Sequence, residues 1–382
     1  MAVCNVCGKP LGAPVYTGNA RTSITTMNKI IEGQTEVFHC QSCDHLQTAE
    51  LPEIERFYAE EYSINEDGLD DDQLYEVRDG KEVYRSEHQA SVLISKLDLS
   101  DAPKVLDYGA AKGATLRKLV AAEPRVIPYL FDVTRRYEAF WRDFPNEAQW
   151  ASFNINREWI GTLDVVTSFY ALEHIPRLGD VLAEIYSLLR PGGTFYFIVP
   201  NTYANWADFI VADHVNHFSR SSLEVMLLRA GFSDIVIDDE AHASAFVVHC
   251  KAVDRQSGAH PEISLSTDQV TQLAAFWSCA QDGITQQESR LPPDGDIAVY
   301  GAGVYGNFIL ACLKRPERVA CFLDQNRFLQ GKEVNGIRII HPDAIPDSVI
   351  GVFVGLNPRH AHSIIESVQS LQSKKIPCFF LD

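Results

Sequence analysis

The sequence predicts an α/β protein with an open, largely parallel sheet, preceded by a four-cysteine metal module and followed by a second, smaller α/β unit. Three observations support this prediction. Two CxxC pairs lie in the first 43 residues, a strand–glycine turn–helix pattern occupies residues 104–116, and a second such pattern begins near residue 297. The 382 residues are enough for two or three domains.

The N-terminal segment contains two cysteine knuckles that can bind one metal ion. Each pair can present two thiolates to a tetrahedral ion, which gives the candidate ligands Cys4, Cys7, Cys40 and Cys43. Gly8 and Asp44 follow the pairs and suit tight turns. Four thiolates leave no open coordination position, so we expect a structural zinc, with a redox pair or an iron–sulfur cluster as the alternatives. His39 and His45 flank the second knuckle and are not counted as ligands.

A connector and a helix are expected between this module and the first sheet strand. Residues 52–80 are acidic and aromatic, and we expect them to form a connector that covers the active site. A helix is expected from about Val83 to Leu97.

The segment KVLDYGAAKGATL (104–116) runs from a buried strand through a glycine-containing turn into a helix expected from about Ala114. Gly109 and Gly113 permit a tight turn, and small residues allow a nucleoside to approach beyond the carboxyl ends of the strands. The next strand ends in Asp132, whose carboxylate can accept hydrogen bonds from two ribose hydroxyls. A third strand (LDVVTSFYALEHI), a helix with an apolar stripe over 178–189 and a fourth strand (RPGGTFYFIVPN) follow.

In this order, these pieces resemble a class I S-adenosylmethionine-dependent methyltransferase over about residues 100–250. The LEHI and LLRPGG segments favour this interpretation over an ordinary dinucleotide-binding domain. The resemblance implies that Asp107 and the glycine loop face the methionine and ribose, that Asp132 holds the ribose, and that Phe153 and Asn154 border the adenine. The full cofactor-binding set is Asp107, Gly109, Ala111, Gly113, Asp132, Phe153, Asn154 and Phe169, with Ala111 standing where a glycine is more usual.

The segment after the fourth strand has a high density of titratable groups. Asp213, His214 and His217 precede a helix that ends at Gly231, for which Ser221 and Glu224 fit a capping box. Histidine can remove a proton near neutral pH, and a neighbouring carboxylate can orient it. His214 is therefore the first candidate for a catalytic base and His174 the second, with packing or capping as the alternative role of His174.

The C-terminal part repeats the strand–glycine turn–helix pattern. After a helix expected over about 266–290 and the Pro292-Pro293 break, IAVYGAGVYGNFILACL places Gly301, Gly303 and Gly306 at dinucleotide-type spacing. A second strand ends at Asp324. These features predict a small Rossmann-like domain.

The three parts together resemble the sugar C-methyltransferases of deoxysugar biosynthesis. In that family a histidine in a Y-x-E-H segment removes the proton beside the ketone of a nucleotide-linked 4-keto deoxysugar, and the enolate attacks the methyl group. The matching residues here are Val211, Asp213 and His214, so the histidine is kept, Asp213 is the acidic residue and Val211 replaces the tyrosine. The resemblance implies His214 and Asp213 as catalytic residues, and His174 and Tyr170 complete the set of catalytic candidates. For a different acceptor such as a hydroxyl, Tyr170, Tyr84 or His217 could position that acceptor.

Other functions stay open at this point. An O-methyltransferase acting on a sugar or another polar metabolite is the first alternative. A NAD-dependent oxidoreductase that uses the C-terminal glycine loop and Asp324 is a more distant one, and a non-enzymatic binding module built on the zinc ribbon is a third. The expected domains are residues 1–75, 76–255 and 256–382, in a monomer or a homodimer.

The composition limits which binding partners and which cellular compartment we expect. The net charge of −18 disfavours nucleic acid as a partner. No apolar run is long enough to cross a bilayer and the N-terminus has no signal-peptide character, so we expect no membrane partner and a cytoplasmic location. The nine cysteines are then expected to be reduced.

Overall fold

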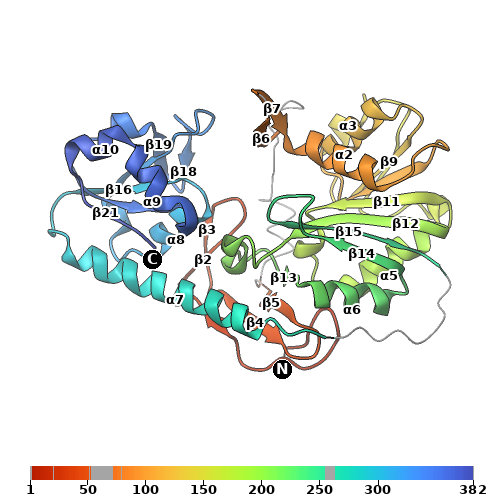
Figure 1. Ribbon diagram of the computed structural model, residues 1–382, viewed down its shortest axis with the longest axis horizontal. Helices are drawn as coiled ribbons and strands as arrows, with labels where there is room; N and C mark the ends of the chain where they lie inside the picture. The colour runs from red at the N-terminus through yellow and green to blue at the C-terminus, as the bar shows by residue number, and fades with distance from the viewer. Residues whose placement is uncertain are drawn as a thin grey trace.

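The structure is a computed structural model that describes residues 2–19, 21–50, 52, 72–78, 80–253 and 263–381. Most of the expected connector lies outside the described residues, so its role as a cover stays a prediction. Figure 1 shows two α/β lobes side by side, the N-terminal strands at the base between them, and α7 (Thr267–Arg290) running from this base to the C-terminal lobe. In the described residues, no helix is both long and apolar enough to span a membrane.

The first lobe is built on a mixed sheet with the strand order β10-β9-β8-β11-β12-β15-β14. The strands from β10 to β12 are parallel, and β15 is antiparallel to both of its neighbours. Their bounds are β8 (Lys104–Tyr108), β9 (Ile127–Asp132), β10 (Gln149–Ser152), β11 (Leu163–Phe169), β12 (Leu189–Pro200), β14 (Ser233–Asp238) and β15 (Ala245–Lys251).

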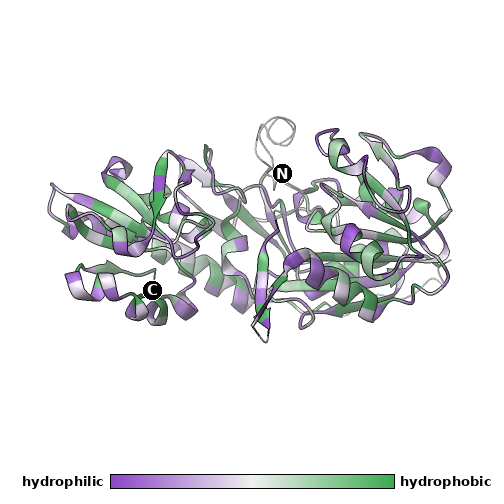
Figure 2. Ribbon diagram, turned by 90° about the horizontal axis from the view of Figure 1, so that it is seen from above, coloured by the Kyte–Doolittle hydropathy of each residue, from purple (hydrophilic) through white to green (hydrophobic). Residues whose placement is uncertain are grey.

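Helices pack on this sheet and short turns follow its strands. The helices are α2 (Arg85–Lys96), α3 (Ala114–Ala122), α4 (Glu138–Trp141), α5 (Leu178–Leu188) and α6 (Arg220–Ala230), and the 3-10 turns are η2 (Arg157–Trp159), η3 (Leu172–His174) and η4 (Trp206–Ile210). The apolar stripe predicted for 178–189 is buried along α5, at Leu178, Leu182, Ile185 and Leu188. In Figure 2 the strands of both lobes are mostly hydrophobic in colour, and hydrophilic residues gather on the outer helices.

Two expected helix starts are wrong. α2 begins at Arg85 rather than Val83, because residues 81–84 form β7 (Lys81–Tyr84), which pairs with β6 (Leu74–Arg78). α6 is capped by Ser219, not Ser221: the Ser219 hydroxyl accepts from the Ser222 amide and the Ser222 hydroxyl accepts from the Ser219 amide. The end of α6 at Gly231, with φ 98°, is as expected.

The N-terminal module is a set of short antiparallel strands: β1 (Tyr16–Thr17), β2 (Thr22–Ile24), β3 (Ile30–Glu32), β4 (Glu36–Cys40) and β5 (His45–Thr48). β5 pairs with β13 (Asn216–His217), the segment just after the candidate base. The hairpin of β2 and β3 also reaches both lobes. Ile24 forms a bridge with Val211, and Asn335 of the C-terminal lobe bonds to the amide of Ile30 and the carbonyl of Asn28.

The second lobe has the strand order β18-β19-β17-β16-β20-β21. Its strands are β16 (Asp296–Tyr300), β17 (Val319–Leu323), β18 (Glu333–Val334), β19 (Ile337–Ile340), β20 (Val349–Val354) and β21 (Cys378–Phe379). Its helices and turns are α8 (Val304–Cys312), η5 (Pro316–Arg318), η6 (Pro342–Ala344), α9 (Pro358–Ser367) and α10 (Gln369–Lys374). The parallel pairing of β19, β17, β16, β20 and β21 agrees with the Rossmann-like expectation. The expected boundary after residue 75 falls within β6, and the domain limits stay predictions.

Candidate functional site

The glycine loop lies at the carboxyl edge of the first sheet, directly after β8. Gly109 and Gly113 have φ of 77° and 71°, conformations that favour glycine, and Ala111 also has a positive φ of 45°. A Cβ at Gly113 would lie 2.6 Å from Leu130 Cδ2, so close packing as well as backbone geometry requires this glycine. The amides of Gly109 and Ala110 both donate to the carbonyl of Phe131, which fixes the loop against β9.

Two buried carboxylates follow the ends of β8 and β9. Burial raises the pKa of Asp107 to about 7, against a hydrogen bond from Thr167, with the charge of Asp132 adding to the rise. Burial also raises the pKa of Asp132 to about 6, although the Ala111 amide donates to its Oδ2 over 2.9 Å. The structure therefore brings these cofactor-binding candidates together around one turn.

Two further cofactor candidates, Phe153 and Asn154, directly follow β10. Phe153 has φ 65°, is 55 % exposed, and its amide donates to the carbonyl of Asp132. Asn154 follows it at the surface. Phe169 ends β11, with its ring centroid 6.1 Å from that of Tyr196.

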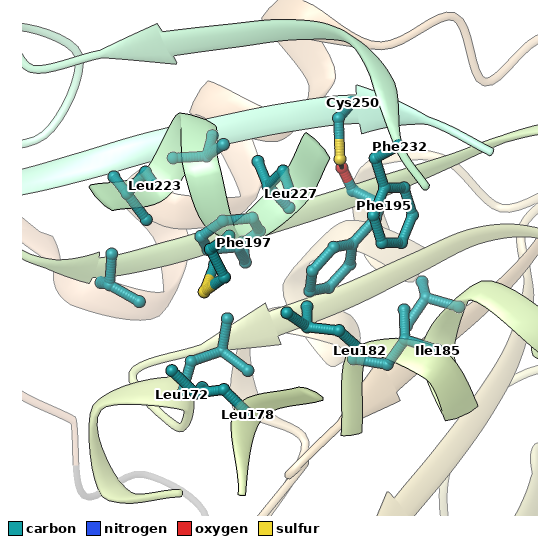
Figure 3. Packing of buried hydrophobic residues seen from close by; sticks show 14 of the residues in the cluster. Leu172, Leu178, Leu182, Ile185, Phe195, Phe197, Leu223, Leu227, Phe232 and Cys250 are labelled. Carbon is teal, nitrogen blue, oxygen red and sulfur yellow. Dashed lines mark hydrogen bonds between the residues drawn. The ribbon is translucent and has the colours of Figure 1, made fainter. Parts of the chain in front are cut away.

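The loop after β11 contacts the glycine turn and leads into the turn that carries His174, beside the candidate base His214. A Cβ at Gly109 would lie 3.0 Å from Ala171 Cβ, so this loop packs directly over the glycine turn. The turn η3 follows at once and carries Glu173 and His174. Leu172 holds the turn in place, because its buried side chain lies among Leu178, Leu182 and Phe197 of the hydrophobic core (Figure 3).

His174 and His214 face each other in this region. Their ring centroids are 4.6 Å apart in an edge-to-face arrangement. Nδ1 of His174 donates to the backbone carbonyl of Asp213 over 3.0 Å. Burial lowers the pKa of His174 to about 4, and the positive charge of His214 adds to this effect.

The carboxylate that pairs with His214 belongs to Asp208 of η4. Nδ1 of His214 donates to Asp208 Oδ1 over 2.5 Å, and Nδ1 of His217 donates to Oδ2 over 2.9 Å. Burial opposes protonation of His214, but the charge and hydrogen bond of Asp208 outweigh it and raise the pKa of His214 to about 9. For Asp208 the two histidines likewise outweigh burial and hold its pKa well below the usual range.

Asp213, the carboxylate expected beside the base, has another partner. Its Oδ1 and Oδ2 accept from the amide (2.8 Å) and hydroxyl (2.5 Å) of Thr26, in the loop between β2 and β3. Asp213 is completely buried and connects the N-terminal hairpin to the backbone beside His214. The carboxylate that bonds to the His214 ring therefore belongs to Asp208, six residues earlier in the chain. No spacing pattern in the sequence had indicated Asp208.

Glu173 is the second residue that the sequence analysis did not select. It is 1 % exposed, and neither carboxylate oxygen has a hydrogen-bond partner in the described residues. Burial raises its pKa to about 7, opposed by the charge of His214. Glu173 belongs to the LEHI segment, but the sequence alone does not show that its carboxylate is buried.

Within the described residues, two groups of side chains have the composition of a metal site. The sulfur atoms of Cys4, Cys7, Cys40 and Cys43 lie within 4.8 Å of one another, and all four residues are buried. Distances are 3.6 Å from Cys4 Sγ to Cys43 Sγ and 3.4 Å from Cys7 Sγ to Cys40 Sγ, close to the edge of about 3.8 Å in a tetrahedron with zinc–sulfur bonds of about 2.3 Å. The residues therefore fit a tetrahedral zinc ion.

Turn geometry in the four-cysteine module agrees with the sequence analysis. Gly8 and Asp44 have φ of 71° and 61°, as their tight turns require. His39 bonds to Asp44 and His45 to Asn216, so neither histidine faces the sulfur atoms as a ligand.

The second such group combines ligand atoms of Glu173, His174 and His214, also within 4.8 Å of one another. The hydrogen bonds of His214 to Asp208 and of His174 to Asp213 give these residues an arrangement suited to proton transfer.

Comparisons with known proteins show that the first lobe is similar to methyltransferases. Residues 83–236 match the family described as a methyltransferase domain. The C-methyltransferase NovU of Streptomyces niveus is 24 % identical over 269 residues, which cover 64 % of this chain and 64 % of that relative. The matched region thus spans less than two thirds of the relative's length.

Solved structures similar to this chain include two methyltransferases. The carbon methyltransferase CurJ is 17 % identical with a TM-score of 0.38, covering 44 % of this chain and 54 % of that protein. Human N-acetylserotonin methyltransferase, solved with S-adenosylmethionine, is 15 % identical with a TM-score of 0.38, covering 44 % and 52 %. Residues 83–236 of this chain are thus similar to a methyltransferase domain.

Proposed function

We propose that this protein transfers the methyl group of S-adenosylmethionine to the carbon beside the ketone of a nucleotide-linked keto sugar, with His214 as the base. The observation that carries this proposal is the buried Asp208–His214 pair beside His174, next to the loop that packs on the glycine turn. The similarity of the chain to a C-methyltransferase supports carbon as the acceptor atom.

The chemistry requires a base and an aligned acceptor. S-Adenosylmethionine supplies an electrophilic methyl group on a good leaving group when bound. Neutral His214 takes the proton from the carbon beside the ketone through Nε2, while Asp208 holds the Nδ1 proton and stabilises the imidazolium that forms. The electron pair left on that carbon would form the new bond to the methyl group, and the electrons of the broken methyl–sulfur bond would stay on the sulfur of the S-adenosylhomocysteine that leaves.

The remaining catalytic candidates position this base. Asp213 fixes the backbone before His214 through Thr26, and its carbonyl orients the His174 ring. Tyr170 lies on the other side of the loop after β11, where its hydroxyl is 3.4 Å from His242 Nδ1. Burial raises the pKa of Tyr170 to about 12, so its hydroxyl keeps its proton.

One observation favours methylation of a hydroxyl as the second candidate function. Val211 is 3 % exposed and bonds through its backbone to the β2–β3 hairpin, so this position offers no phenol to a ketone or enolate oxygen. A hydroxyl acceptor needs only a base, which the Asp208–His214 pair provides.

Product analysis distinguishes these functions. Purified protein is incubated with methyl-deuterated S-adenosylmethionine and either a nucleoside-diphosphate-linked 4-keto deoxysugar or its 4-hydroxy form. We expect methyl gain with the keto sugar and, without the methyl donor, solvent-deuterium exchange beside its ketone. Methyl gain only with the hydroxy form would replace this proposal by O-methylation, and no gain with either would remove sugars as substrates.

A His214→Ala variant tests the base in the same assay. We expect turnover and deuterium exchange to fall by about two to four orders of magnitude, the usual contribution of a general base, with cofactor binding retained. His360→Ala, at an exposed histidine of the C-terminal lobe, is the control. Unchanged turnover in His214→Ala would exclude this histidine as the base.

A further inference from the structure

We propose that Arg85 binds the carboxylate of the methionine part of S-adenosylmethionine, with the Tyr170 ring as its platform. This inference rests on the proposed function, because it assigns one more contact to the same cofactor. Arg85 is the first residue of α2, which shares a buried cluster with α3 and β8 through Ala90 and Leu93.

The guanidinium group lies directly beside the loop that covers the glycine turn. Its Cζ is 3.8 Å from the centroid of the Tyr170 ring, a distance at which the cation is attracted to the aromatic face. Tyr170 directly follows β11 and has φ 54°, a left-handed backbone conformation. The next residue, Ala171, is the one that packs on Gly109.

A second contact sets the orientation of α2 against the glycine loop. Gln89 lies one helical turn after Arg85 on the same face and is 4 % exposed. Its Oε1 accepts from the hydroxyl of Thr115 over 2.6 Å, and Thr115 belongs to the first turn of α3, just after Gly113. The face of α2 that carries Arg85 and Gln89 therefore lies along the glycine loop. Gln89 contacts the start of α3 through Thr115, and Arg85 contacts Tyr170, just after β11.

In the described residues Arg85 forms no direct ion pair, although its charge acts on the buried carboxylate of Glu173. Nη1 of Arg85 donates to the neutral amide oxygen of Gln73 over 3.1 Å. A partly buried guanidinium with free N–H groups is suited to a bidentate bond with a carboxylate.

The other charged and titratable groups near Arg85 do not offer this chemistry. Glu173, which interacts with the charge of Arg85, and the loop residues Asp107 and Asp132 are acidic and cannot attract a second carboxylate. His242, which touches the Tyr170 ring, has its pKa lowered to about 4, chiefly by burial, and is neutral. His88 packs against His242 from α2 and bonds to the carbonyl of Ala241. Arg85 carries a permanent positive charge and can therefore bind the methionine carboxylate.

The test compares two ligands that differ only in the carboxylate. The dissociation constants of S-adenosylhomocysteine and its decarboxylated form, S-adenosyl-3-thiopropylamine, are measured by calorimetry for the wild type, Arg85→Met and Arg85→Lys. We expect the wild type to prefer S-adenosylhomocysteine about ten- to a hundredfold, the size of a charge-assisted bond. Arg85→Met should abolish this preference by weakening S-adenosylhomocysteine alone, and Arg85→Lys should retain part of it.

Controls separate the possible failures. Arg78→Met, at an exposed arginine that pairs with Glu76 in the neighbouring hairpin, should leave both constants unchanged. Equal weakening of both ligands in Arg85→Met, or an unchanged preference, would overturn the assignment. If the wild type bound neither ligand, the proposed function itself would fail, which is a different result. Thermal unfolding of each variant confirms that α2 is intact.

Discussion

At the scale of single residues, the Asp208 carboxylate determines the acid–base properties of the site. It accepts hydrogen bonds from His214, from His217 and from the hydroxyl of Thr202. Nε2 of His217 in turn bonds to the Thr48 hydroxyl of the N-terminal module over 2.7 Å. A buried anion in this position favours the protonated form of His214, so the base is stronger than a free histidine and is neutral only at higher pH.

The first prediction concerns this pH dependence. If His214 acts as a base, kcat/KM of the wild type should rise with pH up to about 9, the pKa to which Asp208 raises it. Asp208→Asn removes the charge that opposes burial, so the rise should move to lower pH and the maximal rate should fall. Asp239→Asn, at an exposed partner of Arg220, should leave the profile unchanged. A profile that stays in place in Asp208→Asn would contradict this account of the pair.

At the scale of elements, glycines determine how closely strands and helices approach in the C-terminal lobe. A Cβ at Gly306 would lie 1.9 Å from the carbonyl oxygen of Gly301, so α8 can pack against the β16 turn only with glycine there. A Cβ at Gly303 would meet nothing within 4 Å, and this residue has φ −85°, which any residue adopts. Two glycines of one motif therefore have different structural roles.

The second prediction follows from this contrast. Gly306→Ala should lower the free energy of unfolding of the C-terminal lobe by about 3 kcal/mol or more, as overpacking against backbone does, while Gly303→Ala should change it by less than about 1 kcal/mol. Urea denaturation followed by circular dichroism measures both. Similar effects of the two substitutions would show that the crossing of β16 and α8 does not depend on Gly306.

At the scale of the whole molecule, the N-terminal module lies between the two lobes and contacts the candidate active site. The side-chain Nδ2 of Asn5, within the first cysteine knuckle, donates to Asn216 Oδ1. Asn216 Nδ2 donates to the carbonyls of Leu172, the first residue of η3, and Ile175, just after η3. Asn19 bonds to the carbonyl of Ala311 in α8. The fold of the cysteine knuckles therefore supports η3, the turn that carries Glu173 and His174.

The third prediction is a stoichiometric zinc ion in this module. We expect about one zinc per chain, since four thiolates complete one tetrahedral site. Cys43→Ser should remove the metal, lower the melting temperature and reduce turnover through η3, whereas Cys279→Ser, at an exposed cysteine of α7, should change none of these. Atomic emission and thermal unfolding provide the measurements, and full metal content in Cys43→Ser would contradict the site.

The sequence by itself determined what depends on neighbours along the chain. Local patterns predicted the glycine turns, the end of β9 at Asp132, the end of β17 just before Asp324, the apolar stripe of α5 and the cysteine knuckles. Residues 83–236 match a methyltransferase domain, in agreement with the prediction for this part of the chain. The methylated substrate, the zinc ion and the roles of His214 and Tyr170 stay predictions.

Only the tertiary structure decided which groups meet and how they titrate. Asp208 reaches His214 across an irregular segment whose path depends on packing, and Thr26 reaches Asp213 from a hairpin far away in the sequence. The buried, unpartnered carboxylate of Glu173 and the guanidinium of Arg85 over Tyr170 are likewise invisible to spacing rules. The physical reason is that desolvation and Coulomb interactions depend on burial and distance in space, which the fold sets after the local elements have formed.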